Sequence, residues 1–208
     1  MDFQLNEAEA RVLGSLMEKE AATPEYYPLS LNALCAACNQ KSNREPVMAL
    51  DEETVLAAVE SLRAKGLILR TSGGDHRVPK FGHRVGEVFN FDRREQAILC
   101  VLMLRGPQTV GELRGRTERL HSFEDLPEVE ATLNRLIERT PALAQRLARQ
   151  PGEKEPRFAH LLSGEVVPHA QPAAPVEHRS PLDERVSRLE TELAEVRRQF
   201  EEFRKNFE

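Results

Sequence analysis

The chain has 208 residues, of which 40% are hydrophobic and 30% charged, and its formal net charge is −5. This balance is typical of a folded protein, and no apolar run approaches the roughly 18 residues that a membrane span needs. The acidic total argues against a nonspecific nucleic-acid coat, which needs a local excess of Lys and Arg. The opening MDFQLNEAEA lacks the features of a secretory signal, and three cysteines suit a reducing compartment, so we expect a cytoplasmic protein.

The first predicted element is an amphipathic helix that begins after Asn6. Asn6 and Glu9 have the spacing of a capping box. Apolar residues then recur at helical spacing on one face, namely Val12, Leu13, Leu16 and Met17. Pro24 and Pro28 forbid continuation of this helix.

Two further helices and a hairpin are expected next. Ser30 can cap a second helix, and a third runs from about Asp51 to Lys65 and stops at Gly66. The run LILRT, a Gly-containing turn and an extended stretch near 76–85 predict a hairpin. Three helices followed by a hairpin is the order of a winged-helix domain, so residues 1–90 are predicted to form one.

The same order of elements recurs in the second half. Asp92 and Glu95 stand 86 residues after Asn6 and Glu9. The apolar positions of the three helices also correspond, at Ile98, Leu99, Leu102 and Met103, then Val110 and Leu113, then Val129, Leu133 and Leu136. The segments ALAQRLAR and RFAHLL predict a second hairpin. The sequence therefore predicts a mainly α fold with small β-hairpin wings (α+β), with a second winged-helix domain at 91–165.

The last part of the chain differs in composition. Residues 166–181 form a Pro/Ala-rich linker. Residues 182–208 carry apolar side chains in alternating steps of four and three, at Leu182, Val186, Leu189, Leu193, Val196, Phe200, Phe203 and Phe207. This heptad pattern predicts a coiled-coil-like helix that forms a homodimer. The alternative is that the helix docks on its own domains, which the bulky phenylalanines favour.

Two segments carry a resemblance to a known family. They are TPEYYPLSLNALCAACNQKSNREPV, from Thr23 to Val47, and the KGLI run ending near Ile68. On these segments the sequence resembles the YceH family of uncharacterised bacterial proteins, and the similarity extends to about Ser163. The resemblance implies a tandem winged-helix fold and, by analogy, regulatory DNA binding, with no ligand or catalytic residue.

The most polar short segment of the predicted domains is the loop after the second helix. Its side chains are of the kinds that bind phosphates and base edges, and they are Asn39, Gln40, Lys41, Ser42, Asn43 and Arg44. We predict that this loop contacts double-stranded DNA. The alternative is a structural loop in which Asn and Ser cap helix ends and Arg44 pairs with a carboxylate.

The first hairpin is a second candidate for DNA contact. Four cations stand there against the single acid Asp75, at Arg70, Arg77, Lys80 and Arg84. Such a basic wing binds the phosphate backbone without reading sequence, and the alternative is a solvated hairpin. In the second half, acidic residues separate the cations Arg114, Arg116 and Arg119, which weakens any positive field.

The remaining candidates point away from catalysis. Tyr26 and Tyr27 either anchor a protein partner or cover the end of the core. The C-x-x-C of Cys35 and Cys38 is half a zinc site, so core packing is expected and no metal or cofactor is predicted. The sequence contains no Walker loop, G-x-S-x-G or H-E-x-x-H motif. We therefore predict a non-enzymatic DNA-binding regulator, or alternatively a protein-interaction scaffold, which the acidic starts of the third helices favour.

Overall fold

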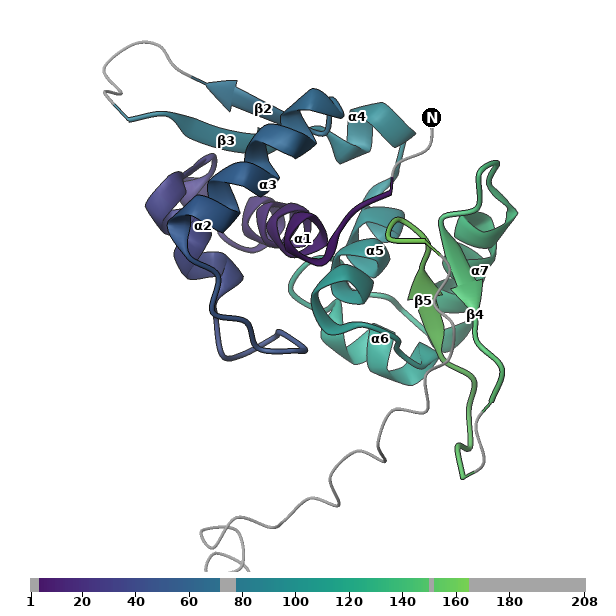
Figure 1. Cartoon of the computed structure of the whole chain (residues 1–208). Helices are drawn as coiled ribbons and strands as arrows, with labels where there is room; N and C mark the ends of the chain where they lie inside the picture. The colour runs from purple at the N-terminus through teal and green to yellow at the C-terminus, as the bar shows by residue number, and fades with distance from the viewer. Residues whose placement is uncertain (1–3, 72–77, 150–151, 165–208) are drawn as a thin grey trace, which may run out of the picture. The chain divides into compact units, whose positions relative to one another are not determined.

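A computed structural model describes residues 4–71, 78–149 and 152–164 (Figure 1). These residues form a mixed α+β protein in which helices dominate and two small antiparallel sheets are present. The elements are α1 (Glu7–Ala22), the 3-10 helix η1 (Pro24–Tyr26), β1 (Leu29–Ser30), α2 (Leu31–Cys38), α3 (Glu52–Ala64), β2 (Ile68–Thr71), β3 (Lys80–His83), α4 (Val85–Phe89), α5 (Arg93–Arg105), α6 (Val110–Arg116), α7 (Leu126–Glu138), β4 (Ala144–Arg146) and β5 (Phe158–His160).

The predicted linker and heptad helix, including Leu182, Val186, Leu189, Leu193, Val196, Phe200, Phe203 and Phe207, lie outside the described residues. Among the helices that are described, none combines the length and apolar character that crossing a bilayer requires.

Side-chain caps fix where the helices begin. At α1 the Asn6 side chain accepts a hydrogen bond from the Glu9 backbone N–H at 2.8 Å, and the Glu9 carboxylate accepts one from the Asn6 N–H at 2.8 Å. Asp92 and Glu95 form the same capping box at α5. The other α-helix starts with a side-chain cap are at Ser30, Asp51, Thr109 and Asp125. The helix starts predicted at Asn6, Ser30, Asp51 and Asp92 are thus confirmed, each cap being worth about 1 kcal/mol.

The order of elements repeats along the chain. Helices α1, α2 and α3 precede the hairpin β2–β3, and helices α5, α6 and α7 precede the hairpin β4–β5. In the first half β1 pairs with β3, so the strand order is β1-β3-β2, with Leu29 opposite Phe81. In the second half Gln108, which precedes α6 as Leu29 precedes α2, forms a β-bridge with Phe158. The repeat predicted from the sequence therefore includes a third strand position that the sequence did not indicate.

A single hydrophobic core runs through both halves. Every residue from Glu9 to Met17 of α1 is buried, because this helix contacts α2 and α3 as well as α5 (Figure 1). In α5, residues 97–104 are buried in the same way. The described residues between 4 and 164 accordingly belong to one compact unit.

Helices α1 and α5 approach each other closely at Gly14. A Cβ atom on Gly14 would lie 3.0 Å from the Leu104 side chain and 3.3 Å from Met103. The Cys100 thiol donates a hydrogen bond to the Gly14 carbonyl oxygen at 3.4 Å. Gly14 and Cys100 are 86 residues apart, the offset that relates Asn6 to Asp92. The two helices therefore meet at equivalent positions of the repeat.

In each half, an ion pair joins the start of the first helix to the end of the third helix. The Glu9 carboxylate lies 2.6 Å from Lys65 Nζ, and the Glu95 carboxylate lies 2.9 Å from Arg139 Nη2. Lys65 and Arg139 are the C-terminal cap residues of α3 and α7. Each cation also donates to a backbone carbonyl just before the first helix of its half. The capping glutamates thus both fix a helix start and tie it to a distant helix end.

Acidification is expected to weaken the first of these pairs. Burial alone raises the pKa of Glu9, but hydrogen bonds from Lys65, Ser61 and the Asn6 N–H outweigh burial and lower the pKa below its ordinary 4.5. A carboxyl whose pKa is depressed by folding stabilises the protein above its unfolded pKa, and this contribution is lost as the pH falls through the folded pKa. The free energy of unfolding should therefore fall on acidification below about pH 4.5.

Urea denaturation at a series of pH values tests this expectation. Glu9→Gln should be less stable than wild type at pH 7 and should lose less stability on acidification. Glu7→Gln, at an exposed position of the same first turn, is the matched control. Parallel pH profiles for Glu9→Gln and wild type would contradict the assignment.

Candidate nucleic-acid interface

The polar loop lies between α2 and α3, and much of its hydrogen-bonding capacity is used within the protein. The Asn39 side chain donates to the Leu50 carbonyl oxygen at 2.7 Å and accepts from the Leu50 N–H at 2.8 Å. Gln40 Oε1 accepts from Lys19 at 3.4 Å and from Arg44 at 3.3 Å. The Asn39 and Gln40 side chains therefore form hydrogen bonds within the protein, at the start of the loop.

Arg44 is the most deeply enclosed residue of the loop. Its side chain is 0% exposed, and its two terminal nitrogens donate to the Glu18 carboxylate at 3.1 and 2.6 Å. The same guanidinium donates to the Ala37 carbonyl oxygen at 2.9 Å. This forked arrangement matches the structural alternative considered for Arg44 and keeps its charge away from the surface.

The tip of the loop is more open. Lys41, Ser42 and Asn43 are exposed. Asn43 has a left-handed backbone conformation with φ 59°, and its side-chain oxygen accepts a hydrogen bond from Arg105 of α5. In the ranges that the structure covers, Lys41 forms no ion pair. Lys41 and Ser42 are thus the two loop donors best placed to meet an external ligand.

The predicted basic wing is the hairpin β2–β3. Arg70 stands opposite Phe81 and Lys80 stands opposite Thr71. Because side chains alternate along a strand and cross-strand pairs share a face, Arg70 and Lys80 lie on opposite faces of the hairpin. Arg84 pairs with Glu87 at 2.9 Å, and Arg77 lies outside the described residues.

The two tyrosines have different environments. Tyr26 is 70% exposed. The Tyr27 hydroxyl accepts a hydrogen bond from the His83 N–H at 2.6 Å, and burial strongly raises the pKa of this phenol. Tyr27 therefore ties the segment after α1 to strand β3, and only Tyr26 is open to a partner.

The solvent-facing side of α3 carries acidic and apolar residues. Glu52, Glu53 and Glu60 are exposed there, and Leu56 is 40% exposed. These carboxylates would repel phosphates if α3 entered a DNA groove. The exposed face of α3 is therefore unsuited to insertion into a DNA groove.

A cleft of about 900 Å³ lies between the two halves of the compact unit. It is bounded by the end of α1, the polar loop, α5 and α6, and four cations line it: Lys19, Arg105, Arg116 and Arg119. The group Arg114, Arg116 and Arg119 was noted in the sequence as a basic cluster weakened by neighbouring acids, and Arg116 and Arg119 of this group line the cleft. The approach of the loop to α5 was not predictable, and it is fixed by a hydrogen bond from the Glu45 N–H to the Leu104 carbonyl oxygen at 2.8 Å.

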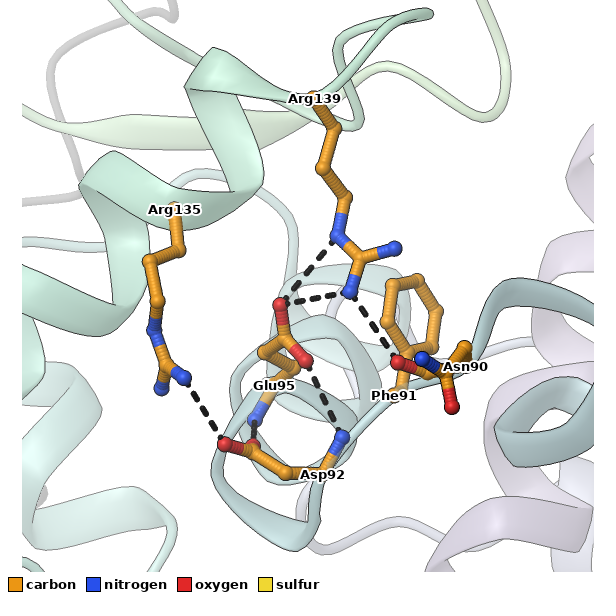
Figure 2. A pocket seen from close by; sticks show the side chains of 6 residues that line it. All are labelled: Asn90, Phe91, Asp92, Glu95, Arg135 and Arg139. Carbon is orange, nitrogen blue, oxygen red and sulfur yellow. Dashed lines mark hydrogen bonds and ion pairs between the residues drawn. The ribbon is translucent and has the colours of Figure 1, made fainter.

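A shallower pocket surrounds the ion pair between Glu95 and Arg139 (Figure 2). Figure 2 shows Arg139 directed at Glu95 and Arg135 directed at Asp92. The paired atoms lie 2.9 Å apart in the first pair and 3.0 Å apart in the second. The Arg139 guanidinium also lies 4.6 Å from the centre of the Phe91 ring. The polar groups of this pocket are engaged with one another, and the Glu9–Lys65 pair is its counterpart in the first half, so we assign it a structural role.

The cysteines are placed as core residues. Cys38 is fully buried, and burial raises the pKa of its thiol to about 11. Cys35 donates to the Leu50 carbonyl oxygen at 3.4 Å, and Cys100 lies in the contact between α1 and α5. No three His, Cys, Asp or Glu side chains of the described ranges are grouped so that they could hold a metal ion.

Comparison with known proteins identifies the family. Residues 5–153 match the family described as "Protein of unknown function, DUF480". The chain is 58% identical to a UPF0502 protein of Solibacter usitatus over 209 residues, covering 100% of both chains. It is 56% identical over 196 residues to a UPF0502 protein of Citrifermentans bemidjiense, covering 93% of this chain and 90% of the relative. A UPF0502 protein of Geobacter sulfurreducens is 50% identical over 220 residues, with 100% of both chains covered. The chain therefore belongs to the DUF480 family, whose relatives in these bacteria are UPF0502 proteins.

Proposed function

We propose that the chain is a cytoplasmic, non-enzymatic DNA-binding regulator built from two winged-helix domains. The observation that carries this proposal is the first half's topology: three helices and a sheet of order β1-β3-β2 whose hairpin bears Arg70 and Lys80. The repeat of the same element order in the second half, and the resemblance to the YceH family, support it. The heptad residues Leu182–Phe207 are proposed to join two copies as a homodimer.

The proposed DNA contacts are mainly to phosphates. The proposed contacts from the hairpin are the exposed Arg70 on one face and the half-buried Lys80 on the other, and those from the loop tip are the exposed Lys41 and Ser42. Arg84 supports the base of the hairpin through Glu87, while Arg44 holds the loop in shape. Cations that bind phosphates release counterions, so binding should weaken steeply as the salt concentration rises.

Selection of genomic DNA fragments by the purified full chain tests the proposal. Wild type should enrich fragments at low salt, and enrichment should fall about tenfold or more when Lys41, Arg70 and Lys80 are all changed to glutamate. Lys154→Glu, at an exposed position of the second hairpin segment, is the matched control and should keep the enrichment. A shared palindromic site would agree with a dimer. Absence of enrichment by wild type at low salt would refute DNA binding.

The exposed face of α3 favours a second candidate, a protein-interaction scaffold. Glu52 and Glu60 flank Leu56 there, which suits a partner that presents a basic and apolar surface. In vivo crosslinking from position 56 should then capture a defined partner, and Glu60→Lys should abolish the crosslink without affecting DNA enrichment. No partner-specific crosslink from this position would count against the scaffold.

A further inference from the structure

The cleft between the two halves has the size and lining of a ligand site. Its volume of about 900 Å³ falls in the range of roughly 300–1,000 Å³ that small-molecule sites occupy. Val101 and Leu104, both buried residues of α5, supply an apolar wall. The polar loop supplies Ser42 and Asn43 on the other side. An apolar wall facing polar donors can hold a ligand with a flat organic part and a charged part.

The cations of the cleft are only partly neutralised. Arg105 donates to the Asn43 side-chain oxygen, and among the described side chains it has no carboxylate within ion-pair distance. Burial lowers the pKa of Arg105, the nearby charges of Arg116 and Arg44 add to this effect, and the charges of Glu18 and Glu45 oppose it. Arg119 is exposed and, within the same described ranges, also lacks a carboxylate partner.

The acidic residues of the lining form their ion pairs and hydrogen bonds with groups other than Arg105 and Arg119. Glu18 is occupied by the two terminal nitrogens of Arg44 and lies 3.6 Å from Lys19. Glu118 accepts a hydrogen bond from Ser122 at 3.2 Å. Arg116 Nη2 lies 3.4 Å from Glu112 Oε1, one turn earlier in α6, and this carboxylate partly neutralises its charge. Arg105 and Arg119 therefore remain free to bind an anion.

The walls of the cleft are held in place without a ligand. The Asn39 side chain closes the loop on Leu50, and the Glu45 N–H ties the loop to α5. Arg116 donates to the Gln108 side-chain oxygen, which fixes the guanidinium before a ligand arrives. A preformed site loses less conformational entropy on binding than a loop that must first become ordered.

From this juxtaposition we propose that the cleft binds an organic phosphate of nucleotide size, with Arg105 and Arg119 on the phosphate and the α5 wall against the organic part. Guanidinium groups bind phosphate through paired, charged hydrogen bonds, which a purely apolar ligand cannot form. The cleft should therefore prefer a ligand that carries phosphate. Such a ligand would act as an effector of the protein. Ser42 is shared with the proposed DNA contacts, but Arg105 and Arg119 are not, so substitutions at these two arginines test the cleft independently of DNA binding.

Calorimetric titration of the full chain tests the site. The probes are the mono-, di- and triphosphates of adenosine and guanosine, unphosphorylated adenosine, inorganic pyrophosphate and a short DNA duplex. At least one nucleotide should bind saturably with one ligand per chain, and adenosine should bind at least about tenfold more weakly because it lacks the charged hydrogen bonds. Arg119→Gln and Arg105→Gln should each weaken nucleotide binding about tenfold.

Matched controls separate binding from folding. Arg146→Gln changes an exposed arginine of β4 outside the cleft and should leave binding unchanged. Because Arg119 is exposed, its variant should retain the wild-type urea denaturation midpoint even if Arg105→Gln does not. Three results would overturn the proposal: no nucleotide binding at millimolar concentration, nucleotide binding that Arg119→Gln leaves unchanged, or pyrophosphate binding as tightly as every nucleotide. A duplex that binds through Arg119 while nucleotides do not would instead assign the cleft to the DNA surface.

Discussion

Arg44→Ala is expected to lower the free energy of unfolding by about 3 to 5 kcal/mol, the usual cost of breaking a buried ion pair by removing one partner. The Arg44 side chain is 0% exposed and Glu18 is 12% exposed. The substitution leaves the Glu18 carboxylate without its forked partner and the Ala37 carbonyl oxygen without its donor. A buried acceptor left without a donor adds its own desolvation cost.

Guanidinium denaturation followed by circular dichroism measures this effect. Arg44→Lys should recover little of the lost stability, because an ammonium group cannot form the two parallel hydrogen bonds of a guanidinium. Lys41→Ala, an exposed position of the same loop, is the control and should change stability by less than about 0.5 kcal/mol. An Arg44→Ala variant within about 1 kcal/mol of wild type would show that the pair contributes little.

Gly14→Leu is expected to destabilise the chain by about 3 kcal/mol or more, because it forces a side chain into the contact between α1 and α5. A Cβ atom alone would already lie 3.0 Å from Leu104. The Gly14 carbonyl oxygen also accepts from Cys100, so a shift of the helices would lengthen that hydrogen bond. The loss should appear in the same denaturation experiment as a lower midpoint.

The control for Gly14 is another helical glycine in open space. Apart from its chain neighbours and the backbone of its own helix, Gly115 of α6 has no atom within 4 Å of where its Cβ would lie. Gly115→Ala should therefore be neutral or stabilise by up to about 1 kcal/mol, because glycine is a poor helix former. If Gly14→Leu were as stable as wild type, the two helices would not be held at the separation described above.

The parts of the fold that were predicted from the sequence depend on local chemistry. The Asn6–Glu9 and Asp92–Glu95 capping boxes are set by residues three positions apart, so their spacing is visible in the sequence. The apolar positions of α3 and the positive φ of Gly66 after it are local in the same sense. Strand β1 and helix α4 were missed because two and five residues are too few to show a period.

The candidate sites were less predictable because they depend on contacts between distant residues. Nothing in the sequence around Arg44 indicates that Glu18, 26 residues earlier, binds its guanidinium. The loop therefore had two interpretations from the sequence; the structure shows that Arg44 is buried and that Lys41 is exposed. The cleft was harder to predict than the loop, because its residues come from both halves of the repeat, Lys19 from the first and Arg119 from the second.

Gly14 and Cys100 stand at equivalent positions of the two halves, yet they are different residues. In a dimer of identical subunits related by a two-fold axis, residues that meet at the axis are the same residue from each subunit. Covalent fusion of two repeats removes that constraint, because each copy is encoded separately. Here one copy has the smallest residue and the other a thiol that fits against it. The chain thus holds an internal pairing whose two sides are complementary to each other, which no self-association of a single repeat could reproduce.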